Sequence, residues 1–77
     1  PCDKIYKFMI DIYLNSDNEV IRNTAVLGIL YNKGLISNPD NIQEVMQKVE
    51  LMRKFISNNL NERREIIDKF EKGEILF

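Results

Sequence analysis

Residues 16–34, SDNEVIRNTAVLGILYNKG, decide the fold class of this 77-residue chain. Ser16 and Glu19 have the spacing of a capping box, in which the hydroxyl accepts the Glu19 amide and the carboxylate reaches back. Gly34 suits the left-handed position that follows many helices, and Leu35 supplies the apolar contact that often accompanies it. The residues between these two signals are apolar at helical spacing. The stretch therefore predicts one helix with both ends marked.

The apolar residues of this helix fall into a main stripe and a supporting set. The main stripe consists of Val20, Thr24, Leu27 and Tyr31, and the supporting set consists of Ile21, Val26 and Leu30. Ala25 and Gly28 add small residues near one face. Because the distance between packed helices depends on the side chains at the contact, we expect a neighbouring helix to approach closely there.

The preceding segment, residues 3–15, predicts a helix that is apolar on nearly all sides. Asp3 is its expected N-cap. One stripe consists of Ile5, Phe8, Met9 and Ile12, and a second of Tyr6, Ile10, Tyr13 and Leu14. A helix of this kind is buried on several sides, and so short a chain has few partners to cover it. We therefore expect part of this helix to contact a second chain.

Residues 38–72 predict one or two further helices. Asn38 and Pro39 are the expected N-cap and first helical residue. An apolar seam at heptad spacing follows, formed by Ile42, Val45, Val49, Met52 and Ile56. Two alternatives remain at residues 57–61: one helix from 39 to about 72, or a break with Asn59 as the next N-cap and Glu62 at position N3. The asparagines there favour the break, because their side chains compete for backbone hydrogen bonds.

The last segment predicts an amphipathic helix that ends at Gly73. Its inward residues are expected to be Leu60, Ile66, Ile67 and Phe70. Ion pairs at i,i+4 spacing are expected for Glu65 with Lys69 and for Asp68 with Lys72. An apolar tail, residues 74–77, follows the glycine. Because no stretch alternates with period two, the sequence predicts an all-α fold, a single domain over residues 1–77 with three to four helices in a small bundle.

The size of the chain predicts a dimer. A domain this short buries only about 60% of its unfolded surface, and small scaffolds add disulfides, metals or oligomerisation to become stable. Cys2 is the only cysteine, and there is no zinc-ligand set. Oligomerisation or docking on a partner is therefore the remaining source of additional stability.

Composition excludes several function classes. The formal net charge of −1 gives no large single-sign field for nucleic acid or anionic lipid. No apolar run approaches the length of a membrane span, so we expect no membrane association. A lone cysteine is atypical of a small secreted domain, which favours a cytoplasmic location.

Catalysis, cofactors and metals are not expected. Cys2 has no histidine to act as a base, because the sequence contains none. Carboxylate pairs such as Glu62 with Glu65 and Glu71 with Glu74 predict a solvated helix face, since di-metal bundles also use histidines. We expect neither an enzyme nor a protein with a small-molecule substrate.

The remaining candidates are apolar and aromatic residues that could form a partner interface. They are Tyr6, Ile10, Tyr13, Leu14, Ile75, Leu76 and Phe77. Aromatic residues are enriched at interface cores, although the same residues could form the core of the domain itself. The sequence thus predicts a non-catalytic protein–protein interaction module, a small regulator, adaptor or inhibitor that acts as a homodimer.

The alternative prediction is a small nucleic-acid-binding regulator. Its phosphate contacts would be Arg53, Lys54, Arg63 and Arg64. Glu50, Glu62 and Glu65 dilute this basic group, and a recognition helix at residues 17–33 would show few polar side chains to base edges.

No family is recognised in the sequence. Residues 18–34 are similar to the second helix of a HEAT-type hairpin, but the repeat that such a solenoid needs does not recur. Residues 33–56 faintly resemble the helical-hairpin aspartyl phosphatases of sporulation regulators. Met46-Gln47-Lys48-Val49-Glu50 stands where those enzymes have Ser-Gln-Glu-Leu-Asp, so no function is transferred.

Overall fold

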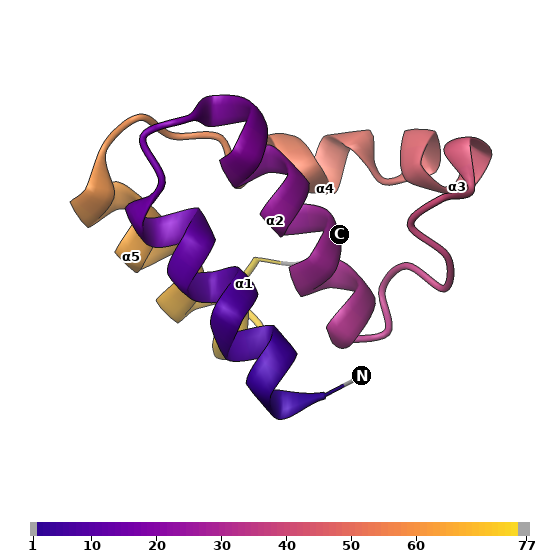
Figure 1. Cartoon of the computed structure of the whole chain (residues 1–77), viewed down its shortest axis with the longest axis horizontal. Coiled ribbons are helices and arrows are strands. Elements are labelled where there is room, and N and C mark those ends of the chain that lie inside the picture. The colour runs from indigo at the N-terminus through magenta and orange to yellow at the C-terminus, as the bar shows by residue number, and fades with distance from the viewer. Residues whose placement is uncertain (1, 76–77) are drawn as a thin grey trace.

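The computed structural model describes residues 2–75, and within that range the chain is helical and contains no strand (Figure 1). The described helices are α1 (Asp3–Asn15), α2 (Glu19–Asn32), α3 (Ile42–Gln47), α4 (Val49–Arg53) and α5 (Leu60–Glu71). Helix α1 packs against α2 and α5, and α4 packs against α2 and α3. The all-α prediction is confirmed. The described range holds five helices because the predicted third helix is divided into α3 and α4.

Helices α1 and α2 form an antiparallel hairpin, which Figure 1 shows in indigo and purple. They approach each other closely at Gly28, where an added Cβ atom would lie 2.8 Å from the sulfur of Met9. The buried Ala25 also lies on the side of α2 that meets α1. The predicted close approach at the small residues is confirmed.

The N-terminus of α2 differs from the prediction. Asn18, not Ser16, is the N-cap, and its side-chain oxygen accepts the amides of Val20 at 2.9 Å and Ile21 at 3.2 Å. The Ser16 hydroxyl instead accepts the amide of Asn18 at 3.1 Å. Asparagine caps helices as well as serine does, and Asn18 directly precedes the apolar run. Likewise, Cys2 is the N-cap of α1, and Asp3 is its first residue.

The predicted C-terminal glycines are confirmed. Gly34 and Gly73 have φ angles of 75° and 76°. The amide of Leu35 reaches the carbonyl of Leu30 at 2.9 Å, and that of Glu74 reaches the carbonyl of Lys69 at 2.8 Å. This is the hydrogen bond of a Schellman motif, which requires a left-handed residue one position earlier.

The predicted helix start at Asn38 is wrong. The Asn38 side chain accepts the amide of Asp40 at 2.9 Å and so closes a turn. Asn41 is the N-cap of α3 and accepts the amide of Glu44 at 3.2 Å. The Glu44 carboxylate accepts the amides of Ser37 and Asn38, which holds the turn against α3. These amide contacts lower the pKa of Glu44.

The predicted heptad seam is also wrong. Ile42 and Ile56, its two ends, are 74% and 51% exposed. The residues that enter the core from this region are Leu51 and Phe55. The helix is interrupted at Lys48, so the seam does not stay on one face.

The predicted break before the last helix is confirmed. Asn59 is the N-cap of α5, and its side chain accepts the amide of Glu62 at 2.9 Å. Ile67 and Phe70 are buried, while Leu60 and Ile66 are half-buried. Both predicted ion pairs are present, at 3.2 Å for Glu65 with Lys69 and 2.9 Å for Asp68 with Lys72.

The core lies between α1, α2, α4 and α5, with Phe55 at its centre. The Phe55 ring makes edge-to-face contacts with Tyr13, at 6.0 Å between centroids, and with Phe70, at 5.2 Å. Such pairs stabilise a core beyond their buried area. The other buried apolar residues are Tyr6, Ala25, Val26, Ile29, Leu30, Ile36, Leu51 and Ile67. None of the described helices combines the length and hydropathy of a membrane span.

Candidate protein-interaction surface

The two tyrosines predicted to meet a partner lie in the core instead. Tyr13 is 1% exposed, and its hydroxyl donates to the backbone carbonyl of Phe55. Tyr6 is also buried, and its hydroxyl donates to the Glu71 carboxylate at 3.0 Å. The prediction of these tyrosines as accessible interface residues is wrong, because other helices of the same chain cover them.

Burial governs the ionisation of both hydroxyls. It raises the pKa of Tyr13 to about 12. Burial, together with the hydrogen bond to Glu71 and the charge of that carboxylate, raises the pKa of Tyr6 well above its ordinary value. Both groups therefore remain protonated hydrogen-bond donors at neutral pH.

The other predicted interface residues are only partly accessible. Ile10, Leu14 and Ile75 are half-buried and pack against the core of their own chain. Leu76 and Phe77 lie outside the described residues.

The accessible apolar stripe of α1 is the one without tyrosines, formed by Ile5, Phe8, Met9 and Ile12. Ile5 is 49% exposed and Phe8 is 60% exposed, while Met9 and Ile12 are half-buried. Both apolar stripes of α1 have helical spacing. The stripe that contains the tyrosines becomes part of the core because α5 packs against it. The first stripe is left at the surface beside α2.

On helix α2, too, the apolar stripe that was expected to be the main one lies at the surface. Its predicted main stripe faces outward: Val20, Thr24 and Tyr31 are exposed, and Leu27 is half-buried. Its buried apolar residues are Ala25, Val26, Ile29 and Leu30. The only charged residue between positions 20 and 31 is Arg22, and its side chain is buried. The outer side of α2 over those positions is therefore uncharged.

A groove runs between α1 and α2, with a volume of about 230 Å³. Its described lining residues are all uncharged: Met9, Ile12, Ile21, Thr24 and Ala25. Ile5 and Phe8 continue the apolar stripe on α1. We call the accessible part of this surface the α1–α2 face, and it consists of Ile5, Phe8, Met9, Ile12, Ile21 and Thr24.

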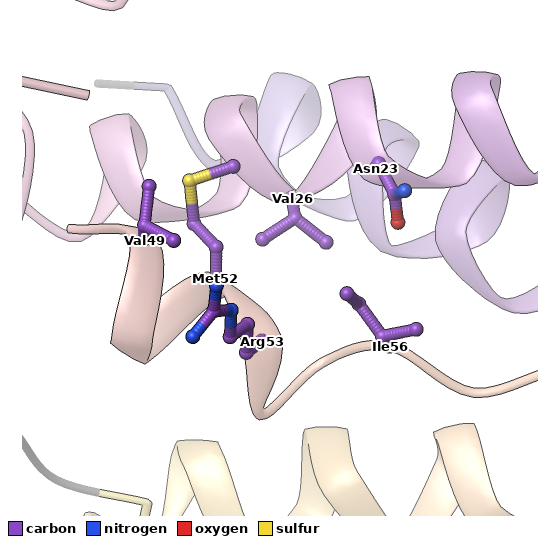
Figure 2. A pocket seen from close by; sticks show the side chains of 6 residues that line it. All are labelled: Asn23, Val26, Val49, Met52, Arg53 and Ile56. Carbon is purple, nitrogen blue, oxygen red and sulfur yellow. The ribbon is translucent and has the colours of Figure 1, made fainter. Parts of the chain in front are cut away.

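A second groove, of about 210 Å³, lies between α2 and α4 (Figure 2). Val26 from α2 and Met52 from α4 point toward each other across it, and Ile56 lies at one end. Arg53 also lines this groove, and its guanidinium is paired with Glu50 at 2.6 Å. This groove is apolar with a mixed-charge edge.

The predicted basic cluster does not form as expected, because Arg63 is buried. It is 6% exposed, and its guanidinium donates to the carbonyls of Ser57 at 3.0 Å and Leu14 at 2.8 Å. Arg63 is therefore not available to bind phosphate. Arg64 is exposed on α5, whereas Arg53 and Lys54 lie at the end of α4 and just beyond it.

Arg22 has the same structural role as Arg63. Its guanidinium donates to the carbonyl of Ser16 at 2.8 Å and to the side chain of Asn58 at 2.9 Å. The two arginines thus hold the α1–α2 loop against the segment before α5. The structural role of these two arginines was not predicted from the sequence, although their spacing from buried apolar residues could have indicated it. Arg22 precedes the buried Val26 by one helical turn, and Arg63 precedes the buried Ile67 by the same interval.

A third hollow, of about 180 Å³, lies at the start of α1 and is lined by Cys2, Asp3, Tyr6, Asn32 and Lys33. The exposed thiol of Cys2 has a lowered pKa, because the amides of Ile5 and Lys4 face it. The Lys33 ammonium lies 4.3 Å from the centroid of the Tyr6 ring. No group of metal-ligating side chains is found among residues 2–75. This hollow offers a cysteine thiol and a lysine side chain but no histidine base.

The chain matches no family model, no curated protein and no solved structure.

Proposed function

We propose that this protein is a non-catalytic protein-interaction module, such as a small regulator, adaptor or inhibitor, that binds through apolar helix faces. The observation that supports this function is the α1–α2 face, where Phe8 is 60% exposed and Ile5 is 49% exposed beside an uncharged groove. Single exposed apolar residues are normal on proteins, whereas contiguous apolar surfaces are typical of binding sites.

The energetics favour a partner on this face. Burying a side chain the size of phenylalanine or isoleucine contributes about 1.5–3 kcal/mol relative to leaving it exposed. Phe8 and Ile5 lie three residues apart on one side of α1, so a single partner could bury both. Interface cores are depleted of charge and enriched in aromatic residues and methionine, and Phe8 and Met9 fit that composition.

Nucleic-acid binding is the weaker candidate. Arg63 donates its hydrogen bonds to backbone carbonyls inside the chain, and Arg53 is paired with Glu50. A chain with a formal net charge of −1 also lacks the general attraction to phosphate on which such binding depends.

Site-specific photo-crosslinking tests the proposed function. A photoreactive phenylalanine analogue is placed at position 8 or, as the control, at the exposed Glu65 of α5, and each protein is irradiated both purified and inside cells. We expect protein adducts from position 8 that Ile21→Ser, on the same face, reduces and that Asp40→Ser, on a distant turn, leaves unchanged. Equal adduct formation from positions 8 and 65, or adducts insensitive to Ile21→Ser, would contradict the proposal.

A further inference from the structure

We propose that the α1–α2 face is covered by a second copy of this chain, with the two α1 helices antiparallel and crossing near Phe8. This inference rests on the proposed function and names its partner. It is supported by the charges that flank the face, by the absence of those charges from the ion pairs described among residues 2–75, and by the uncharged centre of the face.

The charges on α1 are arranged symmetrically about Phe8. Lys4 lies four residues before Phe8, and Asp11 lies three residues after it. Residues at these spacings lie on the same side of a helix, one turn apart. All three side chains are exposed. The apolar residue is thus flanked along the helix by a positive charge on one side and a negative charge on the other.

This arrangement selects the direction of pairing. In a two-fold symmetric interface, a residue i that contacts j of the other copy is matched by j contacting i. Antiparallel α1 helices that cross near Phe8 place Lys4 of each copy beside Asp11 of the other. Parallel α1 helices would instead bring Lys4 to Lys4 and Asp11 to Asp11. Like charges in contact are unfavourable, so the antiparallel arrangement is preferred.

Among residues 2–75, Lys4 and Asp11 take part in no described ion pair. By contrast, Lys7 on the same helix is paired with Asp3 at 3.2 Å. The Asp11 carboxylate accepts the Asn15 amide at 2.8 Å, and this hydrogen bond leaves its charge in place. Both charges are therefore available to another copy.

The uncharged centre of the face also favours a second copy. A partner with a charged surface would have to bury unpaired charges against Phe8 and the groove between α1 and α2, which is costly. A second copy presents the same uncharged residues. The formal net charge of −1 adds little repulsion between two copies.

Charge-swap variants test this arrangement. Lys4→Asp gives a chain with acidic residues at both positions, and Asp11→Lys gives a chain with basic residues at both. Each homodimer then contains only like-charge contacts, whereas a mixture can form a heterodimer with opposite charges at both contacts. Both changes suit the dipole of α1, since the new aspartate lies in its first turn and the new lysine toward its C-terminal end, so loss of helix stability should not confuse the result.

Native mass spectrometry and sedimentation equilibrium measure the outcome. We expect the unmodified chain to be dimeric, each single charge variant to dimerise about tenfold more weakly, and an equimolar mixture to form the heterodimer preferentially. Phe8→Ser should weaken the dimer about a hundredfold or more. The matched controls are Ile42→Ser, an exposed isoleucine of α3, and Asp40→Lys, an exposed charge reversal, and both should leave the dimer unchanged.

The results separate this inference from the proposed function. A dimer insensitive to Phe8→Ser overturns the placement of the second copy, and a mixture without preferred heterodimer overturns the antiparallel pairing. A monomeric chain whose position 8 still crosslinks to another protein overturns the second copy and leaves the interaction module intact. A monomer without such crosslinks overturns both.

Discussion

Arg63 of α5 donates a hydrogen bond to the carbonyl oxygen of Leu14 in α1 across 2.8 Å, and so joins the last described helix to the end of the first. The same guanidinium also binds the carbonyl of Ser57. Because residues 14 and 63 are far apart in sequence, this contact closes the fold around the buried Tyr13. The same contact keeps the Arg63 guanidinium buried, although the sequence suggested this group for phosphate binding.

Replacement of Arg63 should therefore lower stability much more than replacement of its neighbour. Arg63→Ala leaves the carbonyls of Leu14 and Ser57 without their donor, and hydrogen bonds to charged groups contribute about 1.5–3 kcal/mol each. We expect a loss of about 3 kcal/mol in the free energy of unfolding, measured by urea denaturation. Arg64→Ala, at an exposed position of the same helix, should change it by less than about 0.5 kcal/mol. Similar losses for both variants would show that Arg63 has no special structural role.

Removal of the Tyr13 hydroxyl tests the second link between α1 and the segment before α5. Tyr13→Phe keeps the ring contact with Phe55 but leaves the Phe55 carbonyl without its donor. The expected cost is about 1–2 kcal/mol by thermal or chemical unfolding. Tyr31→Phe serves as the control, because Tyr31 is on the surface of α2. A Tyr13→Phe protein as stable as the control would mean that the hydrogen bond contributes nothing.

The raised pKa of Tyr13 predicts a loss of stability at alkaline pH. Burial raises this pKa from 10.0 to about 12, so between these values the unfolded chain loses the proton while the folded chain retains it. The contribution of the neutral hydroxyl is therefore complete below about pH 10 and is lost as the pH rises through about 12. The free energy of unfolding should fall less steeply in this window for Tyr13→Phe than for the unmodified protein. Parallel pH profiles for the two proteins would contradict this assignment.

The close contact at Gly28 predicts a size limit in the α1–α2 hairpin. An added Cβ would already lie 2.8 Å from the Met9 sulfur, so Gly28→Leu should force the two helices apart and cost about 2–3 kcal/mol. Met9→Ala in the same chain should recover part of that loss, because it removes the opposing atoms. Val20→Leu, at an exposed position of α2 outside the α1–α2 face, is the control and should be nearly neutral. Additive effects of Gly28→Leu and Met9→Ala would argue against the contact.

Local signals in the sequence predicted much of the fold. Gly34 and Gly73 end helices because both adopt the left-handed conformation that glycine favours, and Asn59 begins one because its side chain accepts a backbone amide. These features depend on residues within one or two turns. The all-α class follows from the same kind of local pattern.

The covered sides of the helices could not be predicted in the same way. Helix α1 has two apolar stripes, and the sequence alone does not show that α5 will cover Tyr6 and Tyr13 and leave Phe8 exposed. The division of the predicted third helix depends likewise on Leu51 and Phe55, which enter a core formed by distant segments. The candidate interface therefore moved from the tyrosine stripe to the Phe8 stripe, because tertiary contacts decide which stripe is free.

The molar mass of the chain in solution, measured by light scattering beside that of Phe8→Ser, shows whether a second copy covers the α1–α2 face. We expect a mass twice the 9.1 kDa of one chain for the unmodified protein, and a fall toward 9.1 kDa for Phe8→Ser with helical content retained. An unmodified protein that stays at 9.1 kDa at every accessible concentration, or a dimer that Phe8→Ser leaves unchanged, would contradict the claim that a second copy covers the α1–α2 face.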